Sequence, residues 1–288
     1  MNFTINIRTL TMLGCTFFCW SSLSPTSLAQ IQPNFLEKDE DIVFIPAKER
    51  EDPPSRGTPE SEGYGAGSRG SCPYKREMPP LTSLVGVHRA LSSTTKQHPS
   101  FWVYVPYTSK EISQGEFSLQ EGDNDLYRAK VSLPKQIPGI VEIKLPKTSK
   151  PLEAGKEYRW YFELDCTQQN KQVDNSSTNG HSQRPKPFSG DRVTSYATLT
   201  GTVCLVESSP QFEHNLSAAK NPLEQIKVFA KYGIWHDTIA QLIKLRNQEP
   251  DNYKYSRLWQ DLLSQPEINR EQIINESFAG EANALVTN

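Results

Sequence analysis

Residues 151–166, PLEAGKEYRWYFELDC, decide the fold that the sequence predicts, because a turn here leads into a run of large side chains. Successive side chains of a β-strand point to opposite faces of the sheet. One face then carries five apolar side chains: Tyr158, Trp160, Phe162, Leu164 and Cys166. The other carries Arg159, Tyr161, Glu163 and Asp165. We therefore expect a half-buried strand whose apolar face contributes roughly 1.5–3 kcal/mol per side chain to the core.

The approach to this strand resembles a corner found in fibronectin type III and immunoglobulin-like sandwiches. Leu152, Gly155 and Tyr158 have the spacing of that corner, in which a tyrosine hydroxyl ties the incoming turn to the strand. The resemblance implies that the stretch is scaffold, with its large rings filling a two-sheet core.

The alternative is that the same strand is a ligand platform. In that reading Arg159 and Tyr161 face solvent, and Trp102 and Tyr104 from an earlier strand extend the aromatic surface. A flat, exposed aromatic row of this kind would favour sugar binding.

Short β-type runs separated by turn signals continue from residue 81 to residue 206, which is typical of a sandwich or barrel. We expect strands at 100–107, 116–119, 126–133, 140–145, 158–166 and 196–206, with a hairpin turn at 121–125. The fold class that this predicts is mixed β and α (α+β). An immunoglobulin or fibronectin III-like antiparallel β-sandwich spans 72–208, with a long polar loop at 167–191, and a small helical region follows it at 209–280.

Helical periodicity begins after residue 209. Asn221 caps the first expected helix, with Pro222 and Glu224 in its first turn, and Gly233 ends it. We expect further helices at 235–247, from a cap at Asp251 to residue 263, and at 267–278, with a disordered tail over 281–288.

The helical segment FAKYGIWHDTIAQLIKLRNQEPDN is similar to a tetratricopeptide unit in its glycine at 233, its aromatic residue at 235 and its proline at 250. Such units do not bury their apolar faces alone. The resemblance implies that the helices dock on the sandwich or on a partner, and that Trp235 and Trp259 form a groove for a protein or peptide.

The first 29 residues have the pattern of a secretory signal peptide, with one positive charge, an apolar stretch and small residues before the expected cleavage after Ala29. An uncleaved anchor and a lipid-modified start at Cys15 are the alternatives. Residues 30–71 are polar and rich in Pro and Gly, so we expect a disordered linker in which only 41–46 could dock, as an edge strand. These features predict a secreted or periplasmic protein.

The charge and hydropathy of the remaining chain exclude two classes of partner. Loss of the signal peptide leaves 30 basic residues against 33 acidic ones, a balance with no electrostatic footprint for nucleic acid. No later stretch is apolar enough for a transmembrane segment.

Three cysteines remain after the expected cleavage: Cys72, Cys166 and Cys204. Cys72 lies at a domain boundary and Cys166 at a strand end, where a bridge is sterically easy. Cys204 lies inside an apolar strand, where a free thiol behaves as a small hydrophobe. In an oxidising compartment we expect a disulfide between Cys72 and Cys166.

Catalytic and metal-binding motifs are missing from the sequence, so we predict no catalytic residue, no metal site and no cofactor. There is no nucleophile elbow, no phosphate loop after a strand, and no cysteine or histidine cluster with ligand spacing. A pair of catalytic carboxylates stays open as an alternative, because such pairs meet only in three dimensions.

The most distinctive stretches of the chain are Cys72, PLTSLV from Pro80, HPSFWVYVPY from His98, PGIVEIKLP from Pro138, PLEAGKEYRWYFELDC, and AKYGIWHDTIAQLIKLR from Ala230. Through these stretches the chain as a whole resembles the secreted cyanobacterial family known as domain of unknown function 928. The resemblance implies an exported protein with a β-then-α layout and no assigned activity.

Three functions follow from the sequence as hypotheses. The first is a non-catalytic interaction module of the cell envelope that binds an envelope protein or a peptide. The second is a protein that binds or processes carbohydrate through aromatic residues on a sheet face. The third is a hydrolase whose site assembles from separated residues.

Overall fold

The computed structural model describes residues 41–46, 66–67, 72, 75–86, 89–167 and 195–285. These residues belong to one compact unit that begins at Glu40. The predicted signal peptide 1–29, most of the linker 30–71 and nearly all of the loop 167–191 lie outside the described residues.

The described residues contain strands and helices, as the mixed fold class predicts. The strands are β1 Ala66–Gly67, β2 Thr82–Ser83, β3 Ser93–Thr94, β4 Ser100–Val105, β5 Ile112–Glu121, β6 Asn124–Ser132, β7 Gly139–Lys144, β8 Glu157–Cys166, β9 Ser195–Leu205 and β10 Phe278–Ala284. The helices are α1 Pro210–Ala218, α2 Pro222–Lys231, α3 Trp235–Gln248 and α4 Tyr253–Leu263, with 3₁₀ turns η1 Arg89–Leu91 and η2 Glu271–Ile273.

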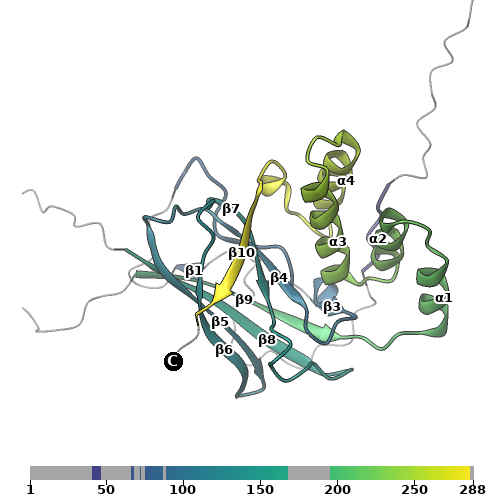
Figure 1. Cartoon of the computed structure of the whole chain (residues 1–288), viewed down its shortest axis with the longest axis horizontal. Helices are drawn as coiled ribbons and strands as arrows, with labels where there is room; N and C mark the ends of the chain where they lie inside the picture. Colours follow the sequence, from purple (N-terminus) through teal and green to yellow (C-terminus); the bar gives the residue numbers. More distant parts are fainter. Residues whose placement is uncertain are drawn as a thin grey trace, which may run out of the picture. The chain divides into compact units, whose positions relative to one another are not determined.

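All of the described strands join in one sheet, in the order β1-β9-β8-β5-β6-β10-β7-β4-β2, with β3 paired to β9. We predicted two separate sheets, as in an immunoglobulin-like sandwich, and the strand order differs from that prediction. The reason is β10, which pairs in parallel with β7 along its first part and antiparallel with β6 at its end. One strand therefore links what would otherwise be two sheets (Figure 1).

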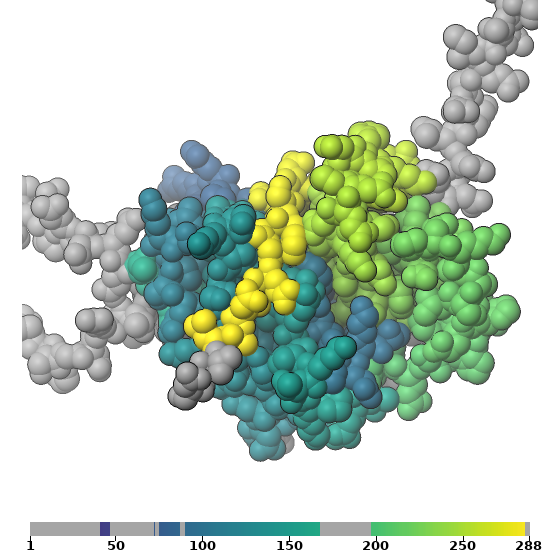
Figure 2. Space-filling model, in the orientation of Figure 1, coloured from purple at the N-terminus to yellow at the C-terminus, as the bar shows by residue number. Residues whose placement is uncertain are grey.

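The C-terminal segment corrects two further predictions. We expected a helix at 267–278 and a disordered tail from 281, but residues 278–284 form β10. The helical periodicity of this segment is weak, and pairing with β7 satisfies its backbone hydrogen-bonding groups instead. Figure 2 shows this yellow segment lying across the molecule between the sheet strands and α4.

The alternation predicted for β8 is confirmed. Its burial alternates along the strand, and Trp160 and Phe162 are fully buried. The Trp160 ring lies 5.6 Å from the Phe101 ring of β4 and 6.4 Å from the Phe117 ring of β5. Because β4 and β5 lie far apart in the strand order, these contacts show that the sheet curls around a shared apolar core.

The predicted tyrosine corner is present at the start of β8. The backbone N–H of Glu153 donates a hydrogen bond of 3.0 Å to the Tyr158 hydroxyl, and the Tyr158 side chain is fully buried. The hydroxyl thus ties the turn before the strand to the strand itself, as the resemblance to sandwich corners implied.

Replacing Tyr158 with phenylalanine should lower the free energy of unfolding by about 1 kcal/mol, because the Glu153 N–H loses its acceptor while the ring packing stays. Urea unfolding of the two proteins measures the difference. Tyr255→Phe is the matched control, since the Tyr255 hydroxyl makes no hydrogen bond within the described part of the chain. An unchanged midpoint for Tyr158→Phe would show that the corner does not stabilise the fold.

The helix boundaries follow the capping residues. Asn221 accepts a hydrogen bond from the Glu224 N–H at the start of α2, as predicted. The cap of α4 is Asn252 and not Asp251, since the Asn252 side chain accepts from the Lys254 N–H. Helix α1 was not predicted, although Ser209 caps it and Pro210 opens it, two signals that the sequence does contain.

The helices dock on the sheet region through α3. The Trp235 indole N–H donates to the Leu84 carbonyl oxygen at 2.6 Å. The Asp237 carboxylate accepts from the Thr94 hydroxyl at 2.9 Å and from the Thr95 N–H at 3.0 Å. In Figure 1 the four helices accordingly lie together beside the sheet. No helix in the described residues is both long enough and apolar enough to span a bilayer.

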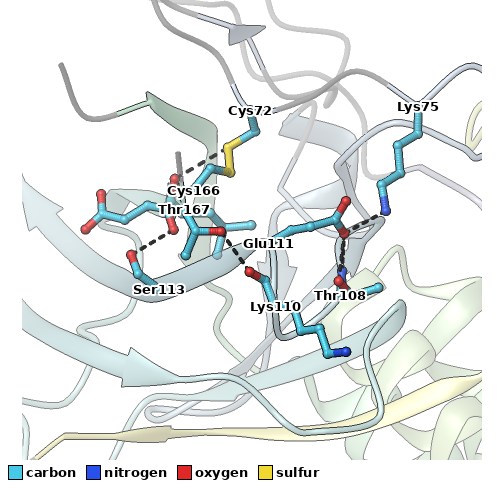
Figure 3. The surroundings of a disulfide bond; sticks show 10 residues. Cys72, Lys75, Thr108, Lys110, Glu111, Ser113, Cys166 and Thr167 are labelled. Carbon is cyan, nitrogen blue, oxygen red and sulfur yellow. Dashed lines mark hydrogen bonds and ion pairs between the residues drawn. A yellow bond between two sulfur atoms is a disulfide. The ribbon is translucent and has the colours of Figure 1, made fainter. Parts of the chain in front are cut away.

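The predicted disulfide between Cys72 and Cys166 is confirmed (Figure 3). It ties Cys72, which lies between β1 and β2 in the chain, to Cys166, the last residue of β8. Cys204 in β9 takes no part in this bridge, as expected. Beside the bridge, Glu111 holds the segment before β5 by accepting hydrogen bonds from Lys75 and from the Thr108 N–H and hydroxyl.

Candidate functional site

An open hollow of about 230 Å³ lies on the outer, polar face of β5, β6 and β8. Its lining residues are Glu116, Ser118, Gln120, Arg128, Tyr161 and Glu163. They come from three neighbouring strands, so the register of the sheet sets their positions. The hollow is smaller than the roughly 300–1,000 Å³ pockets that enclose drug-sized ligands. It therefore suits one small ring or one unit of a longer ligand.

Ser118 explains why a hollow forms at this point. In the sheet register Ser118 of β5 stands opposite Arg128 of β6 on one side and Tyr161 of β8 on the other. Directly opposed Cβ atoms are about 4.5–5.5 Å apart. A serine between an arginine and a tyrosine is therefore the low point of the row, and the two longer side chains form its walls.

The remaining lining residues close the hollow along the strands. Glu116 and Gln120 lie two residues to either side of Ser118, so their side chains point to the same face. Glu163 lies two residues from Tyr161 and stands opposite Glu116 in the register. Two carboxylates thus face each other at one end, and an amide lies at the other.

Arg128 balances part of this negative charge. Its guanidinium forms ion pairs with Asp125 and Glu116, and these hydrogen bonds raise the pKa of Arg128. The same contact with Arg128 lowers the pKa of the Asp125 carboxyl. Arg128 is thus fixed in one orientation at the side of the hollow. Its charge is shared between two carboxylates.

Three lining groups are left for a ligand. Within the described part of the chain, the side chains of Ser118, Tyr161 and Glu163 make no hydrogen bond or ion pair. They offer a hydroxyl, an aromatic ring with a hydroxyl, and a carboxylate that only accepts hydrogen bonds. Such a set can hold a hydroxyl-rich ring, with the tyrosine against its apolar face and the carboxylates accepting from its hydroxyls.

Only one of the four predicted ligand-face residues lines the hollow, and that residue is Tyr161. Arg159 is exposed on the same outer face, opposite Gln120 in the register, but outside the hollow. Trp102 and Tyr104 are buried, so the predicted exposed row of aromatic side chains does not form.

The C-terminal segment is the reason that Trp102 and Tyr104 are covered. The Phe278 ring lies 5.9 Å from the Trp102 ring. Burial raises the pKa of the Tyr104 hydroxyl well above its ordinary value, and the neighbouring Glu276 carboxylate raises it further. Burial likewise raises the pKa of Glu276. The aromatic residues of β4 on this face are therefore packed under a segment that follows the last helix.

The predicted partner groove is not formed by Trp235 and Trp259, because both side chains are fully buried. The Trp259 indole N–H donates to the Ile274 carbonyl oxygen at 3.1 Å, and the Arg246 guanidinium lies 4.7 Å from the Trp259 ring. Both tryptophans anchor the helices to the segments that they cover.

The most polar buried cluster is structural. The Asp237 carboxylate is fully buried and satisfied by Thr94 and Thr95. The neighbouring His236 has its Nδ1 3.2 Å from the Ser100 carbonyl oxygen, and burial lowers the pKa of His236 to about 4. The imidazole is therefore neutral at neutral pH, and its Nδ1–H donates a hydrogen bond to the Ser100 carbonyl oxygen. This cluster fastens α3 to β3 and β4.

No group of three or more His, Cys, Asp or Glu side chains could hold a metal ion in the part of the chain that the structure describes. The hollow contains one pair of carboxylates on neighbouring strands, Glu116 with Glu163. The alternation of β5 and β8 places both carboxylates on the outer face. Only the pairing register of β5 with β8, which cannot be read from the sequence, places them opposite each other.

Comparison with known proteins gives a family and no relative of known function. The family model described as Domain of Unknown Function (DUF928) matches residues 64–278. No curated protein and no solved structure matches the chain. The matched range contains every residue that lines the hollow.

Proposed function

We propose a binding function for this chain, which belongs to the family described as Domain of Unknown Function (DUF928). Its ligand is a neutral, hydroxyl-rich ring such as one sugar unit of a glycan, held in the hollow on the outer face of β5, β6 and β8. The observation that carries the proposal is the hollow itself, in which Tyr161, Ser118 and Glu163 have no partner within the described residues.

The charge of the hollow supports a neutral ligand over an acidic one. Glu116 and Glu163 contribute two negative charges, and Arg128 contributes one positive charge. Like charges that are brought together and partly desolvated repel each other. A sulfated or carboxylated polysaccharide would therefore bind more weakly than its neutral counterpart.

An exported location fits this function. The signal peptide with cleavage after Ala29 is a prediction from the sequence, and the disulfide between Cys72 and Cys166 supports an oxidising compartment. We propose that the protein acts in the periplasm or outside the cell, where glycans are accessible.

Substitution of Tyr161 tests the proposal. In affinity electrophoresis through gels that contain neutral polysaccharides, we expect at least one, such as a β-glucan or a xylan, to retard the protein. Tyr161→Ala should weaken this interaction about tenfold, which corresponds to about 1.4 kcal/mol, because the ring that covers the apolar side of the sugar is lost. Glu163→Gln should weaken it less, because the amide keeps an acceptor oxygen.

Thr202→Ala is the matched control, since Thr202 lies on the neighbouring strand β9 and does not line the hollow. Its retardation should equal that of the original protein. Alginate and dextran sulfate serve as the acidic probes. A protein that no neutral polysaccharide retards, or whose Tyr161→Ala variant is retarded equally, would contradict the proposed function.

The resemblance of the α2–α3 region to a tetratricopeptide unit remains a prediction, and with it the first hypothesis of a protein-interaction module. The buried Trp235 and Trp259 do not support that hypothesis. The carbohydrate proposal rests on the sheet and is independent of it.

A further inference from the structure

Residues 41–46, DIVFIP, form an extended segment that packs against the helices. Ile42 and Phe44 are buried, with 1% and 3% of their surface exposed. Val43 and Ile45 alternate with them and are 62% and 51% exposed. The segment docks, as the sequence suggested. It does not do so as the predicted edge strand, since it pairs with none of the strands that the structure describes.

Its binding surface is built from four residues of the helical region, Ala230, Trp235, Arg257 and Gln265, which we call the docking surface. The Phe44 ring lies edge-on against the Trp235 ring, with centroids 4.9 Å apart. Aromatic pairs favour this edge-to-face arrangement. Trp235, which we expected in an open groove, is thus covered in part by a segment of its own chain.

The backbone of the segment is recognised directly. The Gln265 side-chain oxygen accepts from the Phe44 N–H at 3.0 Å, and the Gln265 amide nitrogen donates to the Ile42 carbonyl oxygen at 2.7 Å. The Ile45 N–H donates to the Ala230 carbonyl oxygen at 3.0 Å. Ala230 is in the last turn of α2, and its carbonyl oxygen also accepts from the Gly233 N–H at 3.1 Å.

These contacts are of the kind by which proteins bind extended peptides. Backbone hydrogen bonds hold any extended segment, while sites for alternate side chains select its sequence. Here the alternate side chains are Ile42 and Phe44. The Arg257 guanidinium adds a weak preference for an acidic residue before them, since it lies 3.5 Å from the Asp41 carboxylate on the surface.

The segment and its docking surface differ in their relation to the family. Ala230, Trp235, Arg257 and Gln265 all lie inside the matched range 64–278, and residues 41–46 lie outside it. The docking surface therefore belongs to the family domain, whereas its occupant comes from the part of the chain before the matched range.

We propose that the docking surface is a peptide-binding site that the chain's own residues 41–46 occupy. A partner binds there by displacing them with an extended segment of the same chemistry, an acidic residue followed by two large apolar side chains at alternate positions. An occupant in the same chain competes at a high effective concentration. A free peptide therefore binds the unaltered protein weakly and binds strongly once residues 41–46 are disabled.

The test uses the full chain and a fluorescently labelled, end-blocked peptide DIVFIP. Ile42→Asp with Phe44→Asp disables the internal segment, because two carboxylates cannot enter the apolar surface without a large desolvation cost. Fluorescence anisotropy should show at least tenfold tighter peptide binding to this double variant than to the original protein. The peptide DDVDIP, which carries the same two substitutions, should not bind either protein.

A matched pair of glutamine substitutions identifies the site. In the double-variant background, Gln265→Ala should weaken peptide binding about tenfold, because two backbone hydrogen bonds are lost. Gln260→Ala should leave it unchanged, because the exposed Gln260 side chain on α4 makes none of the hydrogen bonds described for the segment. Binding that is equal in the double variant and the original protein, or insensitive to Gln265→Ala, would overturn the proposal.

If the double variant fails to fold, hydrogen exchange on the unaltered chain tests the proposal instead. The Phe44 and Ile45 amides should exchange much faster than the amides of β8, and excess DIVFIP should speed their exchange further while β8 stays unchanged. Exchange of residues 41–46 as slow as that of β8, and unaffected by the peptide, would show that the segment leaves its surface only on global unfolding.

Discussion

Replacing Trp160 with alanine is expected to lower the free energy of unfolding by about 3–5 kcal/mol. The Trp160 side chain is fully buried in the middle of β8 and packs on Phe101 of β4 and Phe117 of β5. Trp160 therefore contacts both the neighbouring strand β5 and the strand β4, which is distant in the sheet order. Urea unfolding followed by far-ultraviolet circular dichroism measures the loss.

The surroundings of Trp160 place the expected loss at the upper end of that range. A Cβ atom added at Gly201 would be 2.7 Å from the Trp160 ring, and one added at Gly86 would be 2.6 Å from the indole nitrogen. Since the backbone is already in contact with the ring and is held by the β8–β9 ladder, it cannot readily move in to fill the cavity. The Trp160 N–H has no hydrogen-bond partner within the described residues, so the loss comes from packing alone.

Tyr161→Ala is the matched control for this substitution, because Tyr161 is the next residue on the same strand and points to the outer face. We expect it to change the free energy of unfolding by less than about 1 kcal/mol. Equal losses for the two variants would contradict the assignment of one face of β8 to the core.

The parts of the fold that follow from local pattern could be predicted from the sequence. Alternation along residues 158–166 assigns Trp160 to the core and Tyr161 to the outside without knowledge of any neighbour. The cap at Asn221 and the turn at Gly233 likewise depend on residues within a few positions. Such features are local, and the structure confirms them.

The parts that depend on distant pairing could not be predicted. The strand β10 exists because β7 and β6 offer it unpaired backbone groups, and these strands lie more than 100 residues earlier in the sequence. This strand also covers Trp102 and Tyr104, and a segment so far along the chain could not be placed there from the sequence. One long-range pairing therefore joins the strands into a single sheet and covers two of the four residues of the predicted ligand face.

The hollow on the sheet likewise depends on strand pairing that could not be predicted from the sequence. The sequence places Ser118 and Tyr161 on the outer face of their strands, but the hollow needs them side by side. A shift of one residue in the β5–β8 register would bring Tyr161 opposite a different side chain. It would also move the outward-facing side chains of the shifted strand to the core face of the sheet. Candidate residues can thus be found by alternation, whereas the site itself requires the register.

The second large effect is expected from the disulfide between Cys72 and Cys166. The two residues are 94 positions apart in the sequence. In the chain-entropy model, a bridge that closes a loop of about 100 residues stabilises the folded state by about 4–5 kcal/mol, because it restricts the unfolded chain. Cys72→Ser with Cys166→Ser should therefore destabilise the protein by about 2–5 kcal/mol, the range observed when native bridges are removed from small domains.

Three measurements separate the bridge from other thiol effects. Cys204→Ser removes the third cysteine that the structure describes and should cost less than about 1 kcal/mol, because that residue is only partly buried and lies outside the Cys72–Cys166 bridge. Reductant should lower the urea midpoint of the original protein and of Cys204→Ser, and should leave the double variant unchanged. If the double variant matched the original protein in stability, or if reductant lowered its midpoint as well, the bridge would not be what restricts the unfolded chain.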